Sequence, residues 1–101
     1  MRIKRFEELL SWQKARLLAN SVYILTDKPS FLNDYALKNQ IRKAAGSVMH
    51  NIAEGFESGR DPEFIRFLKF ARRSASEIQS ELYLALDRGY ISQDDQKQRI
   101  I

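Results

Sequence analysis

The sequence has no cysteine and a single histidine among its 101 residues. The lack of cysteine excludes disulfides and thiolate metal sites within the chain. No spacing of nucleophile, base and orienting group surrounds His50, so we interpret it as a surface or interface residue and name no catalytic residue. No apolar run approaches the roughly 20 residues that span a bilayer, and the basic N-terminus lacks the apolar stretch of a signal peptide. These absences predict a cytoplasmic, non-membrane protein that is not an enzyme and binds no metal or cofactor.

What the sequence does contain is typical of one globular domain over residues 1–101. Hydrophobic residues make up 44% of the chain and charged residues 30%, as in folded rather than disordered proteins. The two prolines, at positions 29 and 62, separate stretches of helical periodicity, and no strand pattern is apparent. The net charge of +4 and the pI of about 9.6 favour a polyanionic partner such as nucleic acid. Many proteins with such a charge bind no nucleic acid.

The first stretch predicts a helix from about Glu7 to Asp27 that is apolar on two faces. One face, at helical spacing, consists of Trp12, Ala15, Leu18, Ala19, Val22 and Leu25. The other repeats every seven residues on nearly the opposite side and consists of Leu10, Leu17 and Ile24. Such a helix needs two sets of neighbours. The core supplies one set, and we expect a second subunit to supply the other.

A second helix is predicted to begin after Asn33 or Asp34, either of which can cap it. It extends to about Glu54, with Gly55 as a left-handed C-cap and a flexible loop over residues 55–60. The residues of its predicted inner face are Leu37, Ile41, Ala44, Ala45, Val48 and Ile52.

The third helix has a strong start signal in Asp61-Pro62-Glu63 and a stop at Gly89. Its bundle seam alternates by four and three residues and consists of Phe64, Leu68, Ala71, Ala75, Ile78, Leu82 and Ala85. Ser92 and Asp95 predict a capping box that starts a fourth helix, which the chain end at Ile101 keeps short. The fold expected is all-α: an antiparallel up-down four-helix bundle with a short fourth helix.

Basic residues cluster on the second and third helices, where they are suited to neutralise phosphates in a salt-sensitive way. The alternative is a solvated surface that keeps the protein soluble. The candidate nucleic-acid contacts are Lys38, Arg42, Lys43, Arg66, Lys69, Arg72 and Arg73. Glu77 and Glu81 lie one turn apart but lack the Glu-x-x-His partner of a di-metal bundle, so we interpret them as a solvated face on which Arg73 pairs with Glu77.

Apolar residues beyond those needed for one core predict an assembly surface. The candidate oligomer interface consists of Leu10, Leu17, Ile24, Phe67 and Phe70. The alternative interpretation is a wide core face.

Several segments, taken in order, resemble a known family. They are Trp12-Gln13-Lys14-Ala15, Gln40-Ile41-Arg42-Lys43-Ala44-Ala45, Asn51-Ile52-Ala53-Glu54-Gly55, Glu63-Phe64 with Phe67-Leu68, and Gly89-Tyr90-Ile91. The chain resembles the four-helix-bundle proteins encoded in intervening sequences of 23S ribosomal RNA genes, a family often labelled S23 ribosomal protein. It is similar as well to the accessory variability proteins of diversity-generating retroelements.

The resemblance implies a bundle without enzyme activity that assembles as a ring-like homopentamer. For the retroelement relatives it implies binding to a reverse transcriptase and to nucleic acid through a basic surface. This chain departs from the pattern at Arg73, where relatives usually carry glycine, and in its shorter fourth helix. Asn51 and Glu54 are the most characteristic polar residues of the family, and we interpret them as structural, holding the turn around Gly55.

Two functions are therefore expected as alternatives. The first is a self-assembling, non-enzymatic bundle that presents basic faces to RNA or DNA. The second is a protein–protein interaction or scaffold module without nucleic-acid binding.

Overall fold

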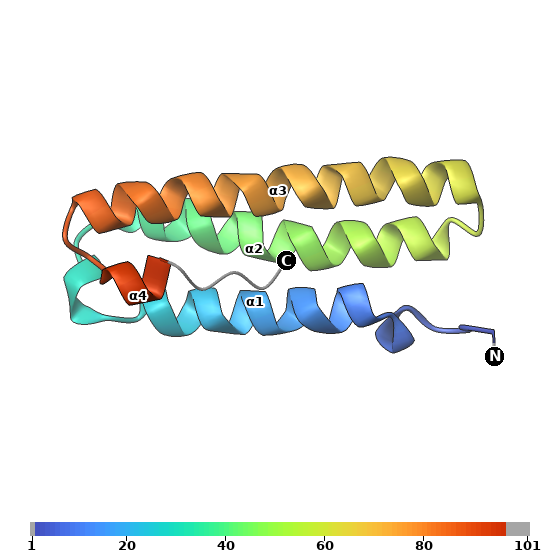
Figure 1. Ribbon diagram of the computed structural model, residues 1–101, viewed down its shortest axis with the longest axis horizontal. Coiled ribbons are helices and arrows are strands. Elements are labelled where there is room, and N and C mark those ends of the chain that lie inside the picture. Colours follow the sequence, from blue (N-terminus) through green and yellow to red (C-terminus); the bar gives the residue numbers. More distant parts are fainter. Residues whose placement is uncertain (1, 97–101) are drawn as a thin grey trace.

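The computed structural model describes residues 2–96, and within this range the chain is helical without strands. Three long helices alternate in direction, so that α2 is antiparallel to the other two: α1 (Leu10–Thr26), α2 (Tyr35–Glu57) and α3 (Asp61–Asp87) (Figure 1). The short helix α4 (Gln93–Gln96) follows, and two 3-10 turns precede α1 and α2, η1 (Phe6–Glu8) and η2 (Pro29–Phe31). The predicted all-α up-down bundle with a short fourth helix is confirmed. The expectation for residues 97–101 lies outside the described residues.

The first helix starts later than predicted because Leu9 interrupts it. Leu9 is extended, with φ −70° and ψ 128°, so Glu7 and Glu8 belong to η1 and α1 begins at Leu10. The predicted inner face is confirmed. Its buried members are Ala15, Leu18, Ala19 and Val22, with Trp12 and Leu25 partly buried against them.

The middle helix α2 packs against both α1 and α3, so its inner face lies at the centre of the molecule. Asp34, one of the two predicted caps, accepts a hydrogen bond from the Leu37 amide at 3.1 Å. The predicted inner-face residues are all buried: Leu37, Ile41, Ala44, Ala45, Val48 and Ile52.

The prediction that Gly55 ends α2 is wrong, and so is the loop predicted from residue 55. The helix continues to Glu57, and the glycine with positive φ is Gly59, at 72°. Gly55 is buried where α3 approaches closely: a Cβ there would lie 2.8 Å from Phe67 Cβ and 2.9 Å from Phe64 Cδ1. The missing side chain therefore serves close helix packing instead of a left-handed turn.

Helix α3 keeps its predicted start, but Asp61 lies in its first turn and Arg60 takes the N-cap position. Gly89, with φ 77°, follows its end as predicted. The buried part of the seam consists of Ala71, Ile78, Leu82 and Ala85. Leu68 departs from the prediction, because 36% of its surface is exposed.

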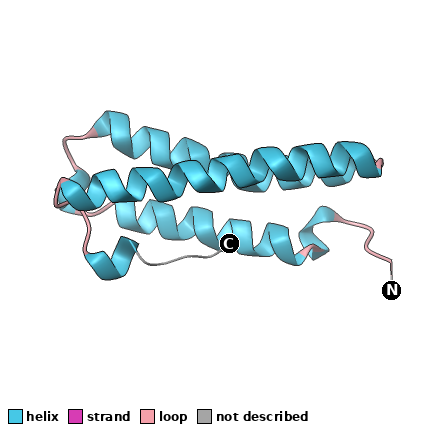
Figure 2. Ribbon diagram, turned by 45° about the horizontal axis from the view of Figure 1, so that its top comes forward, coloured by secondary structure: helices cyan, strands magenta, loops and turns pink. Residues whose placement is uncertain are grey.

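The turn between α3 and α4 is fastened to the start of α2, at the end of the bundle where Figures 1 and 2 show α4. The Tyr90 hydroxyl donates to Asp34 Oδ2 at 2.9 Å, and the Tyr90 ring lies 5.0 Å from the ring of Phe31. The predicted capping box is confirmed, since Ser92 N donates to Asp95 Oδ2 at 3.1 Å and Asp95 N donates to Ser92 Oγ at 3.2 Å.

Candidate nucleic-acid interface

Three of the predicted basic residues surround one shallow hollow on the outer face of α3. The hollow has a volume of about 380 Å³ and is lined by Lys69, Arg72, Arg73 and Ser76. These positions are three, four and seven residues apart, so they lie on one face of the helix. All four side chains are exposed. The arrangement concentrates three positive charges within two turns beside a hydroxyl that can donate a hydrogen bond.

An aromatic ring holds two arginines at the edge of this hollow. The guanidinium carbons of Arg66 and Arg73 both lie 5.5 Å from the centroid of the Phe70 ring. Arg66 also lies 5.3 Å from the Phe67 ring, which meets Phe70 edge-on at 5.8 Å. Cation–π contacts of this kind favour defined positions of the guanidinium groups. The stacking was not predicted, although its sequence signal is a phenylalanine four residues after Arg66 and three before Arg73.

The two arginines differ in their partners. Arg66 donates to Glu63 Oε2 at 2.9 Å, which partly neutralises its charge. Among residues 2–96, Arg73 makes no ion pair. The expected pairing of Arg73 with Glu77 is therefore absent from the described part of the chain, and Arg73 packs on Phe70 instead.

Arg42 on α2 ties α2 to the C-terminal end of α1. Its Nη2 donates to Asp27 Oδ1 at 2.7 Å, and its Nε donates to Thr26 Oγ1 at 2.8 Å. Its guanidinium lies 4.4 Å from the centroid of the Tyr23 ring, and its side chain is 21% exposed. Three partners at a helix end are typical of a structural residue.

Lys38 and Lys43, the other candidates on α2, are half-buried and exposed respectively. The register of the two helices is fixed by a 2.9 Å hydrogen bond from Ser74 Oγ to Ser47 Oγ. Lys38 is nine residues before Ser47, or about 13 Å along the helix axis, whereas Arg73 is next to Ser74. The structure thus brings the α3 cations together and leaves Lys38 at another level of the bundle.

The prediction that Asn51 and Glu54 hold the turn around Gly55 is wrong. Asn51 Nδ2 donates to the Ser47 carbonyl at 2.8 Å and to Ser47 Oγ at 2.9 Å, so it supports the contact between α2 and α3. The turn that follows α2 is held instead by Ser58, whose hydroxyl donates to the Gly55 carbonyl at 2.6 Å. Glu54 is exposed.

The prediction that Glu77 and Glu81 share a solvated face is correct for Glu77 and wrong for Glu81. Glu81 is 8% exposed, and neither carboxylate oxygen has a hydrogen-bond partner among residues 2–96. Burial raises the pKa of Glu81, and the nearby charge of Glu77 raises it further. Between residues 2 and 96 no group of histidine and carboxylate side chains is arranged to hold a metal ion.

The candidate oligomer residues fall into two classes. Leu10, Leu17 and Ile24 form an exposed row on α1, with exposed fractions of 64%, 62% and 72%. Phe67 and Phe70 are half-buried, and Phe67 packs against Gly55. We call the first class the α1 row.

A family model described as 23S rRNA-intervening sequence protein matches residues 7–100, which include all four helices. The chain belongs to this family. A comparison with curated proteins found no match. As a 23S rRNA-intervening sequence protein the chain is a small helical bundle, and the match assigns no reaction to it. In the part of the chain described here, no helix has the length and apolarity to span a bilayer.

Proposed function

We propose that this protein is a non-enzymatic bundle that self-assembles and binds the phosphates of RNA or DNA with the basic face of α3. The single observation that supports it most is the hollow lined by Lys69, Arg72 and Arg73, where three positive charges meet beside Ser76. The hollow lies in the middle of a long helix, whose regular geometry favours a fixed arrangement of phosphate contacts. Such contacts position a nucleic acid without reading its sequence.

The stacked arginines strengthen this proposal. Arg73 is positioned by Phe70 and remains available to an incoming anion, and its planar group can contact a phosphate through two N–H donors. Arg66 is a weaker candidate for a phosphate contact because it already pairs with Glu63. Arg42 contributes through the fold and not through contact, because its donors are engaged with Thr26 and Asp27.

The α1 row is the surface we propose for self-assembly. Its three large side chains are exposed in the single chain, and clustered apolar surface of this kind marks association sites. The proposed assembly is a homo-oligomer, with the five-membered ring of similar proteins as its specific form and the cytoplasm as its location. Where the gene lies beside a reverse transcriptase, that enzyme is the proposed protein partner.

Fluorescence anisotropy with a structured RNA and a DNA duplex, titrated across salt, tests the nucleic-acid proposal. We expect affinity to fall steeply with salt, and Arg73→Glu to weaken binding and lower the slope of log affinity against log salt by about one contact. Arg88→Glu is the matched control, because it makes the same charge change at the far end of α3. Equal binding by Arg73→Glu and the wild type would overturn the assignment.

A second candidate function is a protein–protein interaction or scaffold module that binds no nucleic acid. The α1 row and an apolar groove described below favour it. Absence of nucleic-acid binding even at low salt, together with an intact oligomer in sedimentation analysis, would select this alternative. Gene neighbourhood gives a further discriminator, since a position inside a ribosomal RNA gene and one beside a reverse transcriptase indicate different roles.

A further inference from the structure

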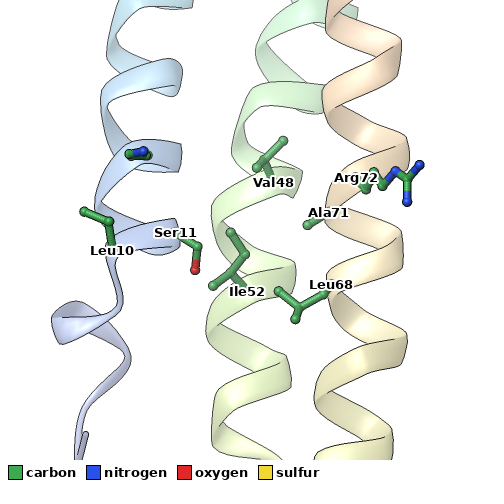
Figure 3. A pocket seen from close by; sticks show the side chains of 8 residues that line it. Leu10, Ser11, Val48, Ile52, Leu68, Ala71 and Arg72 are labelled. Carbon is green, nitrogen blue, oxygen red and sulfur yellow. The ribbon is translucent and has the colours of Figure 1, made fainter. Parts of the chain in front are cut away.

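An apolar groove runs between α1 and α3 in the half of the bundle away from α4. Its volume is about 480 Å³. Its lining residues are Leu10, Ser11, Lys14, Val48, Ile52, Leu68, Ala71 and Arg72. Figure 3 shows Val48 and Ile52 of α2 between the two other helices, with Ser11 turned toward them from α1 and Leu68 and Ala71 from α3. The exposure of Leu68, unexpected for a seam residue, has its explanation here.

The other half of the bundle shows what fits between α1 and α3. There α4 packs against α3, and Ile91 and Gln96 are buried. Lys28, just after α1, pairs with Asp95 of α4 at 2.8 Å. A helix with an acidic residue facing a lysine thus occupies this position near the end of α1. Lys14 lies about 18 Å along the axis from the last residue of α1.

Lys14 places a positive charge at the border of the groove. Lys14 stands on the α1 side, and the stem of Arg72 lines the α3 side while its guanidinium points away from α1 (Figure 3). In the described residues neither makes an ion pair, and the groove lining contains no acidic side chain. An occupant that is apolar toward the groove and acidic along its edges would match both the floor and the border.

We propose that this groove binds an amphipathic helix of a partner protein, with apolar residues spaced three and four apart facing Ile52 and Leu68 and acidic residues facing Lys14. Helix-in-groove recognition of this kind reads apolar anchors along one helix face and flanking charges for specificity. The docked helix would lie along the apolar floor that Val48 and Ile52 form. Arg72 lines both the groove and the α3 hollow, whereas Lys14 lines the groove alone, so Lys14 tests this proposal separately from nucleic-acid binding.

A second copy of this chain is a poorer match than an acidic helix. The apolar row most available for docking lies on α1, and α1 carries Lys14 and Arg16 but no acidic residue. Docking α1 of one copy into the groove of another would therefore place like charges against each other.

A pair of synthetic peptides tests the proposal. Both are about 18 residues long, enough for a helix in isolation, and share one leucine face; one carries glutamates at the flanking positions and the other lysines. Each is labelled, and its fluorescence anisotropy is followed as the full chain is added. We expect saturable binding of the acidic peptide and at least about five-fold weaker binding of the basic one.

Three variants connect binding to the groove. Ser11→Trp places a large ring at an exposed position turned into the groove and should abolish binding. Lys14→Glu should reverse the preference for the acidic over the basic peptide. Arg16 lines a different hollow, so Arg16→Glu, which makes the same change in charge, should leave that preference unchanged. Equal binding of both peptides, no binding of either, or equal effects of Lys14→Glu and Arg16→Glu would each overturn the proposal. So would dissociation of a homo-oligomer by Ser11→Trp, since a second copy would then occupy the groove.

Discussion

The two ends of this bundle are built on the same three helices but are finished differently. At the α4 end, Phe31 is fully buried, Tyr90 bonds to Asp34, and Lys28 pairs with Asp95. At the end where α2 turns into α3, two helices meet tightly at Gly55, yet a groove remains open between α1 and α3. The comparison indicates that hydrogen bonds and an ion pair join the elements at one end, while the other end leaves an apolar surface exposed.

The largest expected effect comes from breaking the closed end at Phe31. Phe31 is 0% exposed, so Phe31→Ala removes a fully buried ring and should lower the free energy of unfolding by about 3–5 kcal/mol. Leu32→Ala, at a neighbour that is 57% exposed, should cost about 0.5 kcal/mol. Urea denaturation of both variants measures the difference, and similar losses would show that Phe31 does not anchor this end.

The open end is tested by a pair of glycines in α2. A methyl group at Gly55 would meet Phe67 Cβ at 2.8 Å, whereas one at Gly46 would come no nearer than 3.6 Å to His50. Gly55→Ala should therefore destabilise the protein by about 1–3 kcal/mol through overpacking. Gly46→Ala should stabilise it by up to about 1 kcal/mol through helix propensity. Thermal unfolding of the two variants provides the measurement, and a stabilising Gly55→Ala would contradict the close approach.

The burial of Glu81 leads us to expect that the free energy of unfolding depends on pH, with an effect of intermediate size. Its raised pKa means that the folded state holds this proton more tightly than the unfolded state does. Its contribution to stability is therefore present at acidic pH, below the ordinary carboxyl range, and is lost as the pH rises toward neutrality. Glu81→Gln should flatten this dependence and raise the free energy of unfolding by about 1 kcal/mol at pH 7.

Unfolding free energies measured across pH test this prediction. Glu57→Gln, at an exposed position near the end of α2, is the control and should leave the dependence unchanged. If Glu81→Gln and the wild type respond identically to pH, the buried carboxylate does not titrate as described.

The smallest expected effect concerns the ion pair that fastens α4. Lys28 and the Ser92 amide lower the pKa of Asp95, so its stabilising contribution is present above the ordinary aspartate pKa and lost as the pH falls below it. Asp95→Asn should cost about 0.5–1 kcal/mol near neutral pH, as expected for a partly exposed pair. Amide exchange in α4 measures this local loss, and Asp94→Asn, at an exposed neighbour, should not increase exchange.

Signals with one physical meaning led to correct predictions from the sequence. A proline in a first helical turn, a capping box and the spacing of small apolar residues placed α3, α4 and the inner faces. Gly55 was misassigned because glycine serves both left-handed turns and close helix contacts, and another glycine four residues later takes the turn. Leu68 fits the seam by spacing, but its exposure depends on which helix stands opposite, and spacing on one helix does not contain that information.

The basic face of α3 followed from periodicity, because residues on one helix need no tertiary information to be grouped. Arg42 looked equivalent in the sequence, and its partners Thr26 and Asp27 become neighbours through the packing of α2 on α1. The burial of Glu81 was missed for the same reason. Glu81 lies beside the buried seam residues Ile78 and Leu82, and the packing of the whole bundle determines how far burial extends around that seam.

The close contact at Gly55 has a consequence for the groove. Ile52 lies one turn before Gly55, and Leu68 directly follows Phe67, the residue that Gly55 touches. The spacing of α2 and α3 at this level, and with it the width available to a docked helix, is thus determined by a single hydrogen atom in place of a side chain. A larger side chain at residue 55 would push α2 and α3 apart. It would thereby change the shape of the groove, although residue 55 does not line it.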